Sequence, residues 1–298
     1  MSEVFFIKST VTHLAYRLYH NPQAKQGSCL LLLHGAGVGG ELTWEGMIPY
    51  LTNWQTILVP DLKGMGESRS HSGEEEAFTA RSLAEDVDHL LDDLNWLDFD
   101  MVGYSLGGLV ILLLNQIRVQ KGQPKIEKIA LLEPATLERE DLLELQQVRN
   151  KYRAASSTIR ETGDVELGIA NFMDGVSPNR RKHPIAEKTT QTRLAHRPFG
   201  FAYALDCVTD LVDDFVTQPH LRGELLKHTQ KVLIFSGGIS HDSLRAHYDV
   251  LQEQLDGWQH FTIAGADHSL PFQKPRQIGY IINEWFALDR NEGKGIEG

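Results

Sequence analysis

The chain has 298 residues and a formal net charge of −11 at pH 7, from 40 acidic and 29 basic side chains. This balance argues against a nucleic-acid partner, because backbone phosphates are bound by clustered lysines and arginines. Two cysteines are too few for a disulfide framework, and no apolar stretch approaches the roughly 20 residues of a membrane span, so we expect a cytoplasmic protein without a membrane-spanning segment.

Short apolar segments recur along the chain, and each ends in a glycine-rich or polar loop. Two alternating segments, 5–9 and 12–19, predict a hairpin at one edge of a sheet. Six further segments are almost wholly apolar, which is typical of parallel strands buried on both faces. These segments are residues 28–33, 56–59, 99–102, 126–132, 232–235 and 260–263.

Helical patterns lie between the predicted strands. Residues 83–94 place four leucines and a valine on one stripe, and Ser82 with Glu85 has the spacing of a capping box at the start of this helix. Residues 106–119 are apolar almost all round, and residues 278–286 form a second stripe. Strands that alternate with helices predict right-handed crossovers and an α/β fold with a doubly wound sheet.

The long stretch between Pro134 and Lys231 contains no predicted buried strand. Its sequence is polar, is interrupted by four prolines and is helical in pattern. The helical patterns cover residues 137–153, 165–173, 186–194 and 201–215. We therefore interpret residues 135–230 as a helical cap, inserted into a core that is formed by residues 1–134 and 231–298.

The segment Gly103-Tyr104-Ser105-Leu106-Gly107 matches the G-x-S-x-G pattern of a nucleophilic serine. It follows a predicted strand and opens a predicted helix. At such a turn, side chains at positions 103 and 107 would clash, and the serine is held in a strained conformation with its hydroxyl exposed. The Leu106 N–H would lie at a helix N-terminus, aimed at an oxyanion. A glycine-flanked serine in an ordinary tight turn is the alternative.

A serine hydroxyl needs a base, and His268 is the candidate because it follows the last predicted strand. A histidine in a surface loop is the alternative. The glycine-rich loop 34–40 offers a second N–H for an oxyanion hole, which we assign to Ala36, while the His34 ring braces the loop. The loop is also close to a dinucleotide-binding G-x-G-x-x-G, but its glycines fall at other spacings and such a site would leave Ser105 and His268 unexplained.

Several motifs, in the same order, resemble those of the α/β-hydrolase superfamily over nearly the whole chain. They are the His34-Gly35 loop, the turn from Asp61 to Ser68, the elbow from Gly103 to Gly108, and His268. The resemblance implies an eight-stranded, mostly parallel sheet flanked by helices, a cap inserted after the sixth strand, and no cofactor. It does not fix the substrate.

The acid that would orient His268 is where the sequence departs from this family. Members usually carry an Asp just past the seventh strand in a Gly-x-x-Asp context, but here Ser240 and His241 occupy the corresponding positions. Asp242, one place later, is the first candidate, although it is also suited to cap a helix. Glu133, at the end of the sixth strand, is the second, because some members carry the acid there. A third interpretation is that neither residue serves.

The cap carries apolar and basic side chains that fit either a substrate pocket or the cap itself. Five apolar residues could line an acyl pocket, but the core of the cap is the favoured interpretation. They are Phe172, Met173, Phe199, Phe201 and Tyr203. Arg193 and Arg197 could bind a substrate carboxylate, although solvated surface charges are favoured. No H-E-x-x-H motif occurs, and Cys29 and Cys207 lie far apart, so no metal site is predicted.

Together these features predict a serine hydrolase that acts on a small-molecule substrate. Ser105 would attack a carbonyl, and His268 would transfer the proton. Asp242 or Glu133 would orient the histidine. The expected reaction is hydrolysis of a carboxylic ester or thioester through an acyl-enzyme. Two alternatives remain: cleavage of a C–C bond or a lyase step on a ring-derived acid, and a non-catalytic ligand receptor built on the same fold.

Overall fold

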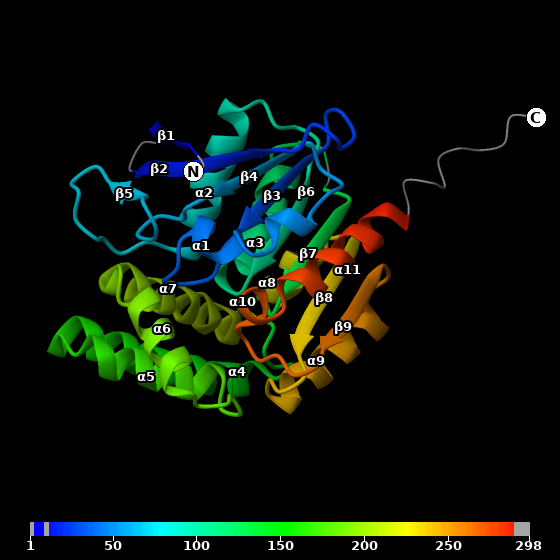
Figure 1. The fold of residues 1–298 in the computed structure, drawn as a ribbon. Helices are drawn as coiled ribbons and strands as arrows, with labels where there is room; N and C mark the ends of the chain where they lie inside the picture. The colour runs from blue at the N-terminus through cyan, green and yellow to red at the C-terminus, as the bar shows by residue number, and fades with distance from the viewer. Residues whose placement is uncertain (1–2, 9–11, 125, 289–298) are drawn as a thin grey trace, which may run out of the picture.

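The computed structural model describes residues 3–8, 12–124 and 126–288. Its centre is a nine-stranded sheet of order β1-β2-β4-β3-β6-β7-β8-β9, in which the short β5 pairs with β2 (Figure 1). The strands are β1 (Val4–Lys8), β2 (Thr12–His20), β3 (Cys29–Leu33), β4 (Thr56–Pro60), β5 (Arg69–Ser70), β6 (Asp100–Tyr104), β7 (Lys128–Leu132), β8 (Lys231–Gly237) and β9 (Trp258–Ile263).

The strand directions agree with the sequence pattern. The six almost wholly apolar segments form β3, β4 and β6 to β9, which pair in parallel, and β1 and β2 form the expected antiparallel hairpin at the edge. Without β5, the sheet has the eight strands that the resemblance implies, and β7 is the sixth. β5 has two residues, too few for an alternating pattern to reveal. The predicted first strand extends to Ser9, which lies outside the described residues.

Helices cover both faces of the sheet, which explains why its inner strands are apolar throughout. The helices of this core are α1 (Gly40–Trp44), α2 (Ala80–Asp93), α3 (Leu106–Gln120), α9 (Asp242–Gln254), α10 (Leu270–Gln273) and α11 (Pro275–Leu288), with a 3-10 turn at Ile48–Tyr50. In β3, Leu31 and Leu33 belong to the buried cluster that contains α2 and α3. Leu30 and Leu32 point to the opposite face and belong to the cluster that contains α11.

The start of α2 differs from the prediction. Thr79 is the N-cap of this helix. The Ser82 N–H donates to the Thr79 hydroxyl at 3.0 Å, and the Thr79 N–H donates to the Ser82 hydroxyl at 3.1 Å. Ser82 is therefore inside the first turn rather than at its start. The predicted partner of Ser82, Glu85, instead pairs with Arg81 at 2.9 Å. The capping-box prediction was wrong because a serine here takes the place of the usual Glu.

Five helices follow one another between β7 and β8, with no strand among them. They are α4 (Leu142–Ser157), α5 (Val165–Val176), α6 (Pro184–Leu194), α7 (Pro198–Thr217) and α8 (His220–Leu226), with a π-helical turn at Thr158–Thr162. Figure 1 shows α4 to α7 gathered below the sheet. Their apolar faces pack together around Ile159, Ile169 and Phe201, which are fully buried.

The start of α7 is tied to the loop that precedes α2. Arg197 Nε donates to Glu75 Oε1 at 2.6 Å, and the Gly200 N–H donates to Glu75 Oε2 at 2.9 Å. Arg197 Nη1 also donates to the Ser68 carbonyl at 2.9 Å. The expectation that Arg197 is a solvated surface charge was therefore wrong, since the side chain joins the helical insertion to the sheet-bearing part of the chain.

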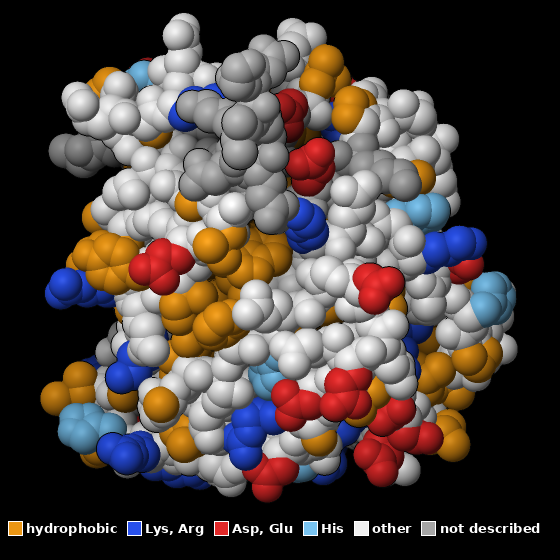
Figure 2. All heavy atoms as spheres, turned by 90° about the vertical axis from the view of Figure 1, so that its right-hand side faces the viewer, with side chains coloured by type: hydrophobic (Ala, Val, Ile, Leu, Met, Phe, Trp, Pro, Cys, Tyr) orange, Lys and Arg blue, Asp and Glu red, His pale blue; other side chains and the backbone are white. Residues whose placement is uncertain are grey.

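The surface agrees with the acidic composition. On the face shown in Figure 2, acidic and basic side chains are interspersed, and the described residues form no continuous basic surface there. No helix within the described ranges combines the length and apolar character needed to cross a membrane.

Candidate active site

Ser105 lies at the junction of β6 and α3 with a strained backbone, φ 52° and ψ −115°. The flanking glycines permit this turn. A Cβ on Gly103 would lie 2.7 Å from the Gly107 carbonyl oxygen, and a Cβ on Gly107 would overlap the Leu33 carbonyl. Because α3 begins at Leu106, the turn places the Ser105 hydroxyl at the carboxyl edge of the sheet.

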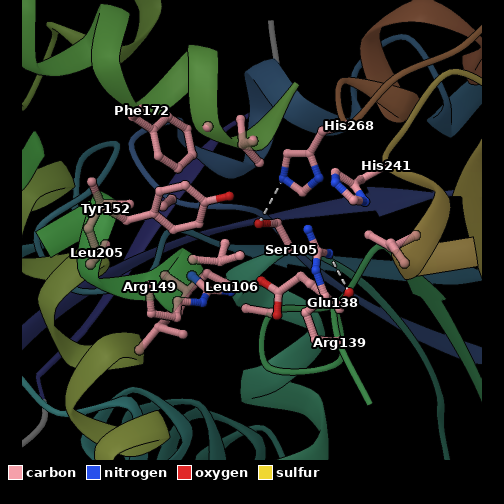
Figure 3. Close-up of a pocket in the computed structure, with 18 of the residues that line it drawn as sticks. Ser105, Leu106, Glu138, Arg139, Arg149, Tyr152, Phe172, Leu205, His241 and His268 are labelled. Atoms are coloured by element: carbon pink, nitrogen blue, oxygen red, sulfur yellow. Dashed lines mark hydrogen bonds and ion pairs between the residues drawn. The ribbon is translucent and has the colours of Figure 1, made fainter. Parts of the chain in front are cut away.

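His268 connects Ser105 to an acid, and Figure 3 shows its ring beside the Ser105 hydroxyl. Its Nε2 lies 3.1 Å from Ser105 Oγ, and its Nδ1 lies 2.8 Å from Glu133 Oε2. Glu133 follows β7, and His268 follows β9, so the three groups come from loops at one edge of the sheet. This is the geometry in which a carboxylate fixes the tautomer of a histidine that accepts a serine proton.

Glu133 is held on its far side as well. Its side chain is buried, and Oε1 accepts from the Gly237 N–H at 2.7 Å and from the Ser240 hydroxyl at 2.6 Å. Ser240 stands where the family pattern usually has its Asp. A serine at that position is the feature of the sequence that favours Glu133 over Asp242 as the acid.

Asp242 does not approach His268. Its side chain is 88% exposed and pairs with Arg245 within the first turn of α9. The residue that caps this helix is His241, whose Nδ1 accepts from the Ser243 N–H at 3.2 Å. Of the two candidate acids, the structure thus brings Glu133 to the histidine and leaves Asp242, our first candidate, in solvent.

The two residues assigned to an oxyanion hole share a pocket with Ser105. Ala36 and Leu106 both line the pocket that contains Ser105 and His268. Neither N–H donates to an acceptor among the described residues. Gly35 allows this loop to approach the nucleophile, since a Cβ there would lie 2.8 Å from the Tyr104 ring.

His34 braces the loop, as expected. Its Nε2 accepts from the Leu62 N–H at 2.8 Å, and its Nδ1 lies 2.7 Å from the Gly35 carbonyl. Burial lowers the pKa of His34, so the ring is neutral and its Nδ1–H donates to Gly35. The ring therefore joins the loop after β3 to the loop after β4.

Aromatic rings hold His268 from the side. The Tyr104 ring lies 5.2 Å from the His268 ring and 6.3 Å from the Phe272 ring. Burial, with the nearby charges of Glu133 and Asp267, raises the pKa of Tyr104 well above its usual value. Its phenol is therefore neutral at physiological pH and serves as an apolar wall for the histidine.

Two pockets meet at Ser105 and His268. The first, which we call the α4 pocket, has a cavity volume of about 40 Å³ and is lined by residues of α4 and α7. The second, the α6 pocket, has a cavity volume of about 240 Å³ and is lined by residues of α6 and α10. Phe172 lines both pockets, and Figure 3 shows it in the α4 pocket.

The α4 pocket contains a buried ion pair. Arg149 pairs with Glu138, and its guanidinium lies 5.2 Å from the centre of the Tyr152 ring. Burial lowers the pKa of Arg149 to about 10, so the group remains charged at neutral pH and the Glu138 carboxylate balances it.

The apolar residues singled out in the cap serve different purposes. Phe172 and Met173 line the α6 pocket, whereas Phe201 is fully buried in the cap's own core. Phe199 is 42% exposed, and Tyr203 lies 6.5 Å from the Phe78 ring. The favoured interpretation as a core of these helices therefore holds for Phe201 and Phe172, which share one buried cluster, while Phe172 and Met173 also line the α6 pocket. Within the described residues no cluster of three or more His, Cys, Asp or Glu could hold a metal ion.

Comparison with known proteins identifies the family. A model of the alpha/beta hydrolase fold matches residues 29–275. The magnesium-chelatase 30 kDa subunit of Rhodobacter capsulatus is 40% identical over 86 residues, which are 29% of this chain and 29% of that protein. Pyrrolizixenacetamide deacetylase of Xenorhabdus hominickii is 29% identical over 145 residues, 46% of this chain and 52% of that protein. Both matches span less than two thirds of these relatives.

A solved structure extends the likeness to nearly the whole fold. A thermophilic esterase from Thermogutta terrifontis matches with a TM-score of 0.69 at 20% identity, covering 96% of this chain and 98% of that one. At this identity the likeness concerns the fold alone. The family model covers most of the chain, and the described sheet and helices have the corresponding architecture. The chain therefore belongs to the alpha/beta hydrolase-fold family.

Proposed function

We propose that the protein hydrolyses a carboxylic ester or thioester of a small or acyl substrate through an acyl-enzyme. The observation that carries the proposal is the hydrogen-bonded chain from Ser105 through His268 to Glu133, at a point where two pockets meet. The name of one relative, a deacetylase, agrees with hydrolysis at an acyl group.

In the first half of the reaction Ser105 Oγ attacks the carbonyl carbon, and its proton passes to His268 Nε2. The Ala36 and Leu106 N–H groups stabilise the negative charge on the carbonyl oxygen. Glu133 stabilises the imidazolium that forms. The histidine then gives the proton to the leaving alcohol or thiol as the acyl–oxygen or acyl–sulfur bond breaks.

In the second half water attacks the acyl-enzyme, with His268 as base. The tetrahedral intermediate collapses, Ser105 recovers its proton from the histidine, and the carboxylic acid leaves. The Glu133 carboxylate keeps the histidine in one tautomer throughout, because both donors on its other oxygen hold it in place.

We propose further that residues 135–230 act as a cap that forms the substrate-binding walls. α4 contributes Val148, Arg149 and Tyr152 to one pocket, and α6 contributes Ala186 and Arg193 to the other. Changes in this region are expected to alter substrate choice more than the chemistry at Ser105.

Labelling with a fluorophosphonate tests the nucleophile. We expect covalent labelling of the folded protein, lost in Ser105→Ala. Ser236→Ala is a matched control, because Ser236 Oγ lies 2.7 Å from His260 Nε2, and His260 Nδ1 lies 2.7 Å from Asp249 Oδ1. Ser236 is fully buried and should not react. Absence of labelling in folded protein, or labelling that persists in Ser105→Ala, would contradict the proposal.

A substrate panel separates the ester from the thioester reaction. Esters of increasing acyl-chain length and their matched thioesters should give a measurable kcat/KM with the wild-type protein and none with Ser105→Ala. Hydrolysis of neither series at any chain length by protein that is labelled at Ser105 would contradict the proposed reaction and would favour C–C bond cleavage.

A further inference from the structure

Arg193 differs from most of the arginines in the helical insertion. Most of these are matched with carboxylates: Arg149 with Glu138, Arg153 with Asp210 and Asp213, Arg160 with Asp206, Arg180 with Asp174 and Glu187, and Arg197 with Glu75. The half-buried Arg193 guanidinium has no hydrogen-bond acceptor and no carboxylate partner within the part of the chain that the structure describes. It lines the α6 pocket, together with Ser105 and His268.

The rest of the α6 pocket offers no charge to balance this cation. Its walls are largely apolar, with Val38, Phe172 and Leu194 among them, and no described Asp or Glu lines it. An unpaired cation beside apolar walls loses hydration without gaining an ionic partner. A bound anion would supply that partner, and a guanidinium forms paired, parallel hydrogen bonds with a carboxylate.

The position of the cation is fixed by the segment that carries the base. The Arg193 guanidinium lies 4.8 Å from the centre of the Phe272 ring, within the range of a cation–π contact. Phe272 is in α10, four residues after His268, and its ring packs against Tyr104. The guanidinium is therefore placed relative to the proposed reacting atoms rather than extended into solvent.

The α4 pocket is less suited to an anion. Its Arg149 is already balanced by Glu138, and a second anion there would face that carboxylate. Arg139 lines the α4 pocket as well and donates to the Glu138 carbonyl. In the α6 pocket, in contrast, no described Asp or Glu lines the wall opposite the guanidinium.

We propose that Arg193 makes the protein selective for esters that carry a carboxylate, which binds in the α6 pocket while the ester carbonyl lies at Ser105. A single guanidinium matches the single charge of a carboxylate, whereas a phosphate monoester carries about two charges at neutral pH. The inference rests on the proposed ester hydrolysis and specifies its substrate class.

Matched ester pairs test this selectivity. Methyl hydrogen glutarate and methyl 4-carbamoylbutanoate differ only in a carboxylate or a carboxamide on the acyl side, and O-acetylglycolate and O-acetylglycolamide differ likewise on the alcohol side. We expect kcat/KM to favour the carboxylate about tenfold or more in at least one pair. Arg193→Gln should bring that ratio close to one, chiefly through KM, and Arg193→Lys should retain part of it.

Lys188→Gln is the control, because Lys188 is an exposed cation on the same helix and does not line the pocket. It should leave the ratio unchanged. Equal hydrolysis of both members of each pair by the wild type, or an equal loss for both in Arg193→Gln, would overturn the inference. So would loss of the ratio in Arg139→Gln but not in Arg193→Gln. Normal labelling of Ser105 alongside any of these results would leave the proposed hydrolase function standing.

Discussion

Ser105 and Glu133 both have a backbone conformation that side chains rarely adopt, with φ of 52° and 42°. Each such residue costs about 1–3 kcal/mol, which the surrounding structure must offset. Hydrogen bonds to neighbouring strands do so: the Ser105 N–H donates to the Leu132 carbonyl at 2.9 Å, and the Glu133 N–H donates to the Phe235 carbonyl at 3.1 Å. Among the described residues other than glycine, Asn95 and Thr136 also have a positive φ, so two of the four such positions are the proposed nucleophile and acid.

Glu133→Gln should lower kcat about 10³–10⁴-fold, by analogy with substitutions of a triad acid. The glutamine oxygen would accept from the Gly237 and Ser240 donors, so its NH₂ group would face His268 Nδ1. Nδ1 would then have to accept, which leaves the proton on Nε2 and prevents it from receiving the Ser105 proton. Ester hydrolysis under saturating substrate measures the change.

Asp242→Asn is the comparison, because the exposed Asp242 is outside the hydrogen-bonded chain. Its kcat should match that of the wild type. A large loss in Asp242→Asn together with full activity in Glu133→Gln would reverse our assignment of the acid.

At the scale of elements, Glu75 determines how firmly α7 is attached. Glu75→Gln should lower the free energy of unfolding by about 1–3 kcal/mol, because Arg197 would lose its charged acceptor while remaining largely buried. Urea unfolding measures the change. Glu74→Gln is the control, because the side chain of Glu74, the preceding residue, is exposed. This substitution should change the free energy of unfolding by less than about 0.5 kcal/mol. Equal effects of the two substitutions would contradict this role of Glu75.

The α9 helix carries a buried histidine that makes stability depend on pH. His247 has no hydrogen-bond partner for either ring nitrogen among the described residues, and burial, with the nearby Arg222 charge, lowers its pKa to about 4. The unfolded chain, with a His pKa near 6.5, therefore binds more protons than the folded chain between about pH 6.5 and 4. With respect to this histidine, the free energy of unfolding is therefore highest above about pH 6.5, and it decreases as the pH falls from about 6.5 to 4.

Acidification from pH 7 to pH 5 should therefore cost about 1–2 kcal/mol through His247 alone. Denaturant unfolding of the wild type and of His247→Leu at both pH values measures this contribution, because other groups that titrate are common to both proteins. The variant should lose less stability than the wild type. An identical pH dependence would show that His247 is protonated equally well in the folded state.

At the scale of the whole molecule, the sequence pattern predicted the sheet apart from the two-residue β5, but it did not identify the acid. Apolar runs such as 28–33 report burial on both faces directly, so they located the parallel strands. The choice between Glu133 and Asp242 depends on which way each loop turns in space, which local pattern does not record. Arg197 was misjudged for a similar reason, since its partner Glu75 lies 122 residues away in the chain.

The hydrogen-bonded chain at Ser105 also spans much of the sequence. Ser105 and His268 are 163 residues apart, Glu133 and His268 are 135 apart, and Gly237, which holds Glu133, is 104 residues from it. The loops after β6, β7, β8 and β9 must all be docked before the serine becomes reactive. Contacts of such long range form slowly. In a refolding experiment, the rate at which Ser105 becomes reactive toward a fluorophosphonate should therefore report the rate at which the last of these strands docks.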